Sequence, residues 1–176
     1  MSKQFEKFIS QQKTMIYILY AALNFSLFPF LYIAYADMLT RPQQPNSILP
    51  FPFQLIGILP ALVSIFMHYK MRSPQKLALQ IQDNTPWASA HFNHEILKEM
   101  PDKEAKLVTV FPRFMASFTA SLALNESIVI FGIIAITLDG ISYSQFLISF
   151  FTGLTLNLLM FPNLEKLFNE IKLKIN

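Results

Sequence analysis

Four stretches of almost uninterrupted apolar residues alternate with more polar segments along the chain. They cover about residues 15–38, 48–67, 108–138 and 141–161. A helix needs about 20 consecutive apolar residues to cross the hydrocarbon core of a bilayer, and each stretch is of that order. The pattern therefore predicts an all-α, polytopic bundle of four transmembrane helices, with residues 1–176 forming a single membrane domain.

The polar segments carry amphipathic patterns. Residues 2–14 place apolar side chains at helical spacing between lysines, and the tail 163–176 gathers its apolar residues on one helical face and its charges on the other. Such patterns are typical of helices that lie at a membrane surface. The segment 68–107 is charged and too short to bury a core of its own. We expect it to pack on the bundle or to lie on the membrane.

Composition agrees with a membrane protein, and the charges give it an orientation. Hydrophobic residues make up 53% of the chain, with a mean hydropathy of +0.38, which is more apolar than an ordinary soluble domain. Of the 14 lysines and arginines, 13 lie before residue 15, between Lys70 and Arg113, or in the tail. Basic segments stay on the cytoplasmic side. We therefore predict a multi-pass protein of a bacterial inner (plasma) membrane, with both termini and the segment 68–107 in the cytoplasm.

An internal repeat divides the chain into halves. A shift of 101 residues aligns residues 21–34 with residues 122–135, and seven of the fourteen aligned pairs are identical. Each copy is followed by a second apolar stretch and then by an amphipathic segment. The repeat predicts two pseudo-equivalent two-helix hairpins, related by an axis along the membrane normal.

The candidate chemistry centres on one acid in the third stretch. Glu126 lies near the middle of that stretch, where an ionised carboxylate costs about 2.5–3.5 kcal/mol on insertion scales, so we expect it to be neutral at rest. Its candidate partners are Asn125, Asn24 and Asn157. One hypothesis makes Glu126 a proton or cation carrier. The other makes it a polar clasp between helices, and we favour the clasp because no second intramembrane acid or basic counter-ion is available for a relay.

Small residues form a regular series around this acid. Ala116, Ala120, Ala123 and Ser127 recur every three or four residues, and Gly132 fits the same interpretation. Small side chains let transmembrane helices approach closely. We therefore predict that this series is a helix-packing face.

One histidine cluster has a spacing that could suit a metal. His91, His94 and Glu95 fall at positions i, i+3 and i+4 of a predicted helix. The spacing differs from the H-E-x-x-H pattern of zinc enzymes, and the chain has no cysteine. A solvated helical face is the better interpretation, so we expect no metal and no cofactor.

The chain also lacks the short motifs of common enzymes. It contains no G-x-S-x-G sequence, no phosphate-binding glycine loop and no paired catalytic carboxylates. We therefore predict that it is not an enzyme, and a metal-binding membrane enzyme is the weakest alternative. Topology accounts for the basic segments, so we expect no nucleic-acid binding.

Residues 124–138, L-N-E-S-I-V-I-F-G-I-I-A-I-T-L, resemble the carboxylate-bearing helix of rotary ATPase proteolipid subunits. In that helix an acid is followed about six residues later by a glycine, and Glu126 and Gly132 stand at those positions. The resemblance implies that Glu126 is an ion-carrying carboxylate. The overall layout resembles small bacterial four-span membrane proteins, a likeness that implies no particular activity.

Two functions remain open. The first, which we favour, is a non-enzymatic accessory, assembly or structural subunit of a membrane complex, or a homo-oligomer. Its partners would be the lipid bilayer and either copies of itself or other membrane subunits. The alternative is a proton- or cation-coupled transporter, or a proteolipid-like subunit, that uses Glu126.

Overall fold

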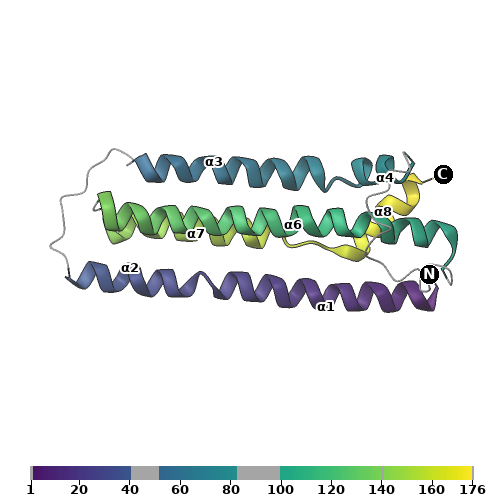
Figure 1. The fold of residues 1–176 in the computed structure, drawn as a ribbon, viewed down its shortest axis with the longest axis horizontal. Helices are drawn as coiled ribbons and strands as arrows, with labels where there is room; N and C mark the ends of the chain where they lie inside the picture. The colour runs from purple at the N-terminus through teal and green to yellow at the C-terminus, as the bar shows by residue number, and fades with distance from the viewer. Residues whose placement is uncertain (1, 41–51, 83–99, 140, 176) are drawn as a thin grey trace. The chain divides into compact units, whose positions relative to one another are not determined.

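The computed structural model describes residues 2–40, 52–82, 100–139 and 141–175. Within these ranges the chain forms helices and no strand (Figure 1). Two helical stretches, Lys3–Thr40 and Asp102–Leu138, are long and apolar enough to cross a membrane, and the number rises to four if each of two bent helix pairs is one span. The predicted all-α fold is confirmed, and the helices are compatible with a multi-pass membrane protein.

The helices group into two compact units, which we describe separately. Unit 1 comprises residues 1–18, 67–119 and 162–176, and unit 2 comprises residues 19–66 and 120–161. The charges divide in the same way, because 13 of the 14 lysines and arginines belong to unit 1. The single membrane domain inferred from the apolar pattern stays a prediction.

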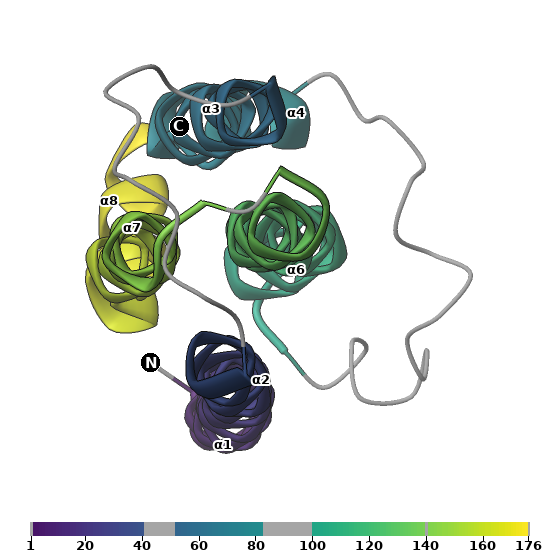
Figure 2. The ribbon, with the colours of Figure 1, turned by 90° about the vertical axis from the view of Figure 1, so that its left-hand side faces the viewer.

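Unit 2 contains the apolar helices. They are the last turns of α1 (Lys3–Phe25), α2 (Phe28–Thr40), α3 (Pro52–Phe66), the second half of α6 (Asp102–Ile134) and α7 (Tyr143–Leu159). Seen end-on, α6 and α7 lie between α2 and α3 (Figure 2). A buried cluster that includes Leu27, Val129 and Phe146 packs at the centre of the unit.

Local sequence explains where several of these helices begin and end. Ser142 caps α7 in a reciprocal capping box with Gln145, which satisfies backbone N–H groups that have no partner within the helix. A π-helical turn over Met67–Met71 follows α3, and another over Ala135–Asp139 follows α6. Helix α3 continues through Pro60 without interruption.

Unit 1 is built from α4 (Pro74–Gln82), α8 (Leu164–Lys174), the first half of α6 and the first turns of α1. Helices α4 and α8 pack against each other. The amphipathic residues 2–14 belong to α1, which runs from Lys3 to Phe25 without a break, and their position at a membrane surface stays a prediction. No helix-breaking residue occurs within that range, so the ladder of backbone hydrogen bonds continues.

Aromatic rings form the core of unit 1. Phe8 meets Phe111 edge-on at 5.4 Å between ring centroids, and Phe5 meets Phe168 in the same way at 5.7 Å. The apolar face predicted for the C-terminal tail thus belongs to α8, where Leu164, Phe168 and Ile171 are buried. Asn163 caps this helix by accepting a hydrogen bond from the backbone of Lys166.

Candidate functional site

A chain of three asparagines links three helices inside unit 2. Asn125 on α6 donates from Nδ2 to Asn157 Oδ1 on α7 at 2.9 Å, and Asn157 donates from its own Nδ2 to Asn24 Oδ1 on α1 at 3.2 Å. Asn125 and Asn157 are fully buried. Asn24 in turn donates to the carbonyl of Tyr20, one helical turn earlier. We call these three side chains the asparagine layer.

The layer joins the two copies of the internal repeat. Asn24 and Asn125 occupy equivalent positions in the alignment, and both bond to Asn157. The three asparagines singled out from the sequence are therefore brought together.

A fourth helix contributes a hydroxyl next to this layer. Ser64 on α3 is buried, and its Oγ lies 3.2 Å from both the carbonyl of Ser121 and the sulfur of Met160. The same sulfur lies 3.6 Å from Asn125 Nδ2. Among the described residues no donor reaches Asn125 Oδ1. Ser64 was not predicted as a site residue, and in the sequence it is one of two polar residues in an otherwise apolar stretch.

The break between α1 and α2 places a serine against α6. Pro29 has no N–H group and its ring clashes with the carbonyl four residues earlier, so the α1 ladder ends at Phe25 and α2 starts at Phe28. Ser26 lies in this break. Its Oγ is 2.7 Å from Glu126 Oε1 on α6 and 2.6 Å from the carbonyl of Leu23.

Glu126 therefore bonds to a residue that was not among its predicted partners. Its hydrogen-bond partner is Ser26, whereas the three asparagines bond to one another. The internal repeat offered a signal, because it aligns Ser26 with Ser127, and both hydroxyls bond to the carbonyl three residues earlier. The Glu126 side chain is half-buried.

The series of small residues on α6 is divided between two environments. Ala116 and Ala123 are exposed, Ala120 and Ser127 are half-buried, and Gly132 is buried. A Cβ added at Gly132 would lie 2.8 Å from Ser149 Cβ on α7. Gly132 thus permits a close approach of α7, and Gly153 does the same from the other helix, since its added Cβ would lie 2.8 Å from the Asn125 carbonyl.

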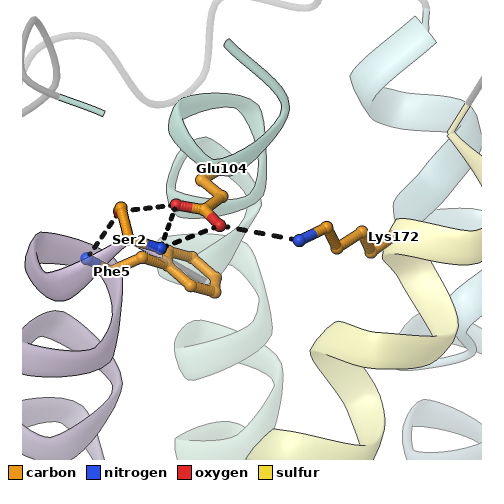
Figure 3. Close-up of polar contacts among 4 residues, drawn as sticks. All are labelled: Ser2, Phe5, Glu104 and Lys172. Carbon is orange, nitrogen blue, oxygen red and sulfur yellow. Dashed lines mark hydrogen bonds and ion pairs between the residues drawn. The ribbon is translucent and has the colours of Figure 1, made fainter. Parts of the chain in front are cut away.

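A buried carboxylate organises the polar part of unit 1. Ser2 donates to Glu104 both from its Oγ, at 2.6 Å from Oε2, and from its backbone N–H, at 3.1 Å (Figure 3). Lys172 on α8 approaches Oε1 within 3.5 Å, and the Phe5 N–H donates to the same Ser2 hydroxyl. Burial raises the pKa of Glu104, but the hydrogen bonds from Ser2 and the charge of Lys172 outweigh it and hold the pKa below its ordinary value of 4.5.

A buried arginine follows the π-helical turn after α3. Arg72 is 5% exposed, donates from Nη2 to His68 Nδ1 at 2.5 Å, and places its guanidinium 5.6 Å from the ring centre of Phe118. Burial lowers the pKa of Arg72 to about 10, so the side chain stays charged at neutral pH. His68 Nδ1 must be the acceptor, because a guanidinium only donates.

The metal hypothesis falls outside the part of the chain that the structure describes, since His91, His94 and Glu95 all lie within residues 83–99. Among the described residues, no group of three histidine, aspartate or glutamate side chains could hold a metal ion.

Comparisons of the chain with protein-family models, with curated proteins and with solved structures found no match.

Proposed function

We propose that unit 2 is embedded in a bilayer as four spans. Its described residues contain no lysine, arginine or histidine. Large apolar side chains such as Leu59, Leu62 and Phe66 on α3 are more than half exposed, and in water such a surface would favour aggregation. Lipid would cover it.

The four spans would form two pseudo-equivalent hairpins in the inner membrane, with both termini and the segment 68–107 in the cytoplasm. The concentration of basic residues in unit 1 supports this orientation. The identity of seven of the fourteen aligned pairs supports the equivalence of the halves.

Single-cysteine labelling in intact cells tests the orientation, because the chain has no cysteine of its own. A membrane-impermeant maleimide should miss a cysteine at Gln75 on α4 and react with one at Thr40, which ends α2. Both positions are exposed. The opposite pattern would invert the proposed topology.

The role that the geometry supports best is that of a non-enzymatic subunit, either an accessory, assembly or structural part of a membrane complex or one copy of a homo-oligomer. The observation that supports this role is that the polar side chains within unit 2 form hydrogen bonds between the helices of this chain. Asn157 joins α7 to α1 and α6, and Ser26 joins the α1–α2 break to Glu126. Glu126 would then act as a polar clasp.

The contact with a neighbouring subunit would use the exposed part of the small-residue series on α6. Within unit 2, Ala123 is exposed and Ala120 is half-buried, so another helix could approach the α6 backbone closely there. We expect the protein in a mild detergent to have the mass of an oligomer or of a complex with another membrane protein.

The mass of the purified particle, measured by light scattering, tests this role. Ala123→Trp should dissociate the assembly, whereas Leu159→Trp, at a position on α7 that is 72% exposed, should not. A wild-type protein that purifies as a monomer without a partner would overturn the proposal.

A proton or cation carrier is the second candidate, and one observation favours it. The Ser26 hydroxyl has a single proton but lies within hydrogen-bonding distance of two oxygen atoms, Leu23 O and Glu126 Oε1. A proton on Glu126 would supply the second hydrogen bond. The resemblance of residues 124–138 to proteolipid helices implies the same role. Glu126→Gln should then abolish transport without unfolding the protein, and a carbodiimide should label Glu126 and block transport by the wild-type protein. Normal transport by the variant would remove this candidate.

A further inference from the structure

We propose that Glu126 carries a proton in this conformation and donates it in a hydrogen bond to Ser26, which couples the protonation of Glu126 to the break between α1 and α2. The inference rests on the proposed clasp and adds the position of its proton and the element that senses it.

The break leaves one carbonyl in need of a donor. In an uninterrupted helix the carbonyl of Leu23 would accept from the N–H of Leu27. Here the Leu27 N–H turns to the carbonyl of Asn24 at 3.3 Å. The carbonyl of Leu23 accepts instead from Ser26 Oγ at 2.6 Å. The Ser26 hydroxyl therefore completes the last turn of α1.

Counting protons then assigns the state of Glu126. A hydroxyl has one proton to donate and two lone pairs that accept. The distances from Ser26 Oγ to Leu23 O and to Glu126 Oε1 are 2.6 and 2.7 Å, and both are typical of O–H···O hydrogen bonds. An ionised Glu126 would leave two acceptors to share one proton. A protonated Glu126 donates to Ser26 while Ser26 donates to Leu23, and every short contact has its proton.

The surroundings of Glu126 agree with a neutral carboxyl group. The described residues of unit 2 contain no lysine, arginine or histidine, so none of these offers a counter-charge. The other acids of the unit are Asp37 on α2 and Asp139 at the end of the π-helical turn, and an acidic residue carries no positive charge that could offset that of an ionised Glu126. Without a counter-ion, an ionised carboxylate inside a membrane is unfavourable.

Loss of this proton would act on the helix break. If Glu126 gives its proton to a water molecule, the Ser26 hydroxyl can serve either the new carboxylate or the carbonyl of Leu23, but not both. The stronger, charge-assisted bond goes to the carboxylate, so α1 loses the bond that completes its last turn. Ionisation should therefore loosen the chain at Ser26 and Leu27.

Infrared difference spectroscopy tests the assignment directly. The spectrum of the wild-type protein at neutral pH, minus that of Glu126→Gln, should show the carbonyl stretch of a protonated carboxyl group. In Ser26→Ala the band should remain and move to higher frequency, because the hydrogen bond to Ser26 is lost. Ser127→Ala should leave the band in place, since the Ser127 hydroxyl bonds within its own helix, to the carbonyl of Leu124. If Glu126→Gln does not fold, wild-type protein carrying ¹³C-labelled glutamate identifies the band by its isotope shift.

The absence of a protonated-carboxyl band from wild-type protein would overturn the proposal, and so would a band that Ser26→Ala does not move. These outcomes are independent of the particle mass that tests the proposed function. An oligomer without the band would refute the proton on Glu126 alone, and a monomer with the band would refute the subunit role alone. If ionisation loosens the break, the protection of the Leu27 amide, measured relative to its intrinsic base-catalysed exchange rate, should fall at high pH in the wild-type protein and not in Glu126→Gln. Equal protection in the two proteins would refute that coupling.

Discussion

Asn157 on α7 accepts a hydrogen bond from Asn125 on α6 at 2.9 Å, and neither side chain has any exposed surface. The amide of Asn157 also donates to Asn24, so one side chain connects three helices. A fully buried amide is stable only when it is hydrogen-bonded. The hydrogen bonds of Asn157 therefore hold α1, α6 and α7 together at a position without access to water.

Replacing Asn157 should destabilise the protein measurably. Asn157→Ala removes both bonds and leaves Asn24 Oδ1 and Asn125 Nδ2 short of a partner, at an expected cost of about 1–3 kcal/mol. Thr155→Ala, at an exposed position on the same helix, should change the stability by less than about 0.5 kcal/mol. Thermal unfolding in a mild detergent measures both. Equal effects of the two variants would mean that the asparagine layer contributes nothing specific.

Gly153 should tolerate no side chain. An added Cβ would lie 2.8 Å from the Asn125 carbonyl and 2.9 Å from Val129 Cγ2, so α7 must move away from α6, and overpacking of this kind costs about 1–3 kcal/mol.

Gly57→Ala is the matched control for Gly153→Ala. The nearest atom to a Cβ at Gly57 is 3.8 Å away, an ordinary contact distance. Gly57→Ala should therefore keep the wild-type unfolding temperature while Gly153→Ala lowers it. A Gly153→Ala variant as stable as the control would show that α6 and α7 are less close than described.

The sequence alone allowed the helices to be predicted and the asparagines to be singled out, but it paired the asparagines with Glu126 and did not give the orientation of α6. Apolar runs of helical length mark α-helices without knowledge of their partners. Which face of a helix is buried is harder, because one residue turns the face by about 100°. On α6 the buried polar residues are Glu104, Ser117, Ser121 and Asn125. Ala116 and Ala123, which are small enough to suit a packing face, are exposed.

The contact between Ser26 and Glu126 could not be predicted for a related reason. It depends on where Pro29 ends α1 and on which backbone carbonyl loses its N–H donor at the break. The periodic pattern of apolar residues predicts neither. The Ser2–Glu104 contact joins residues 102 positions apart, and no local signal relates them. Long-range polar pairs of this kind follow from the packing of the helices and not from propensity.

Ser26 should contribute more to stability than its repeat equivalent. Ser26→Ala removes the bond to Glu126 and the bond to Leu23, and we expect a loss of about 0.5–1.5 kcal/mol. Ser127→Ala removes only a bond within its own helix and should cost less than about 0.5 kcal/mol. Unfolding in detergent at neutral pH compares the pair. Equal losses of stability would indicate that the contact between Ser26 and Glu126 on α6 does not stabilise the fold.

Two replacements of Glu126 should rank by their hydrogen-bonding capacity. Gln keeps an amide N–H that can donate to Ser26, whereas Leu leaves Ser26 without a partner on α6. Glu126→Leu should therefore unfold at a lower temperature than Glu126→Gln. The reverse order would argue against a clasp, because it would mean that polarity at this position destabilises the helices.

The stability of unit 1 should fall in acid through Glu104. The folded-state pKa of Glu104 lies below its ordinary value of 4.5, because the hydrogen bonds from Ser2 and the charge of Lys172 together outweigh the effect of burial. A carboxylate whose pKa is lowered by folding stabilises the folded state fully above the unfolded-state pKa, and the contribution disappears as the pH falls through the folded-state pKa. Near neutral pH the contribution should be constant.

Glu104→Gln tests this dependence. The unfolding temperature of the wild-type protein should decline as the pH falls below about 4.5, and the variant should be less stable at neutral pH and show a shallower decline. Glu165→Gln is the control, because the Glu165 side chain, which pairs with Lys13, is 62% exposed and exposed pairs contribute little. If Glu104→Gln follows the wild-type pH profile, the charge on Glu104 does not hold α1, α6 and α8 together, and the packing of Phe5 against Phe168 must suffice.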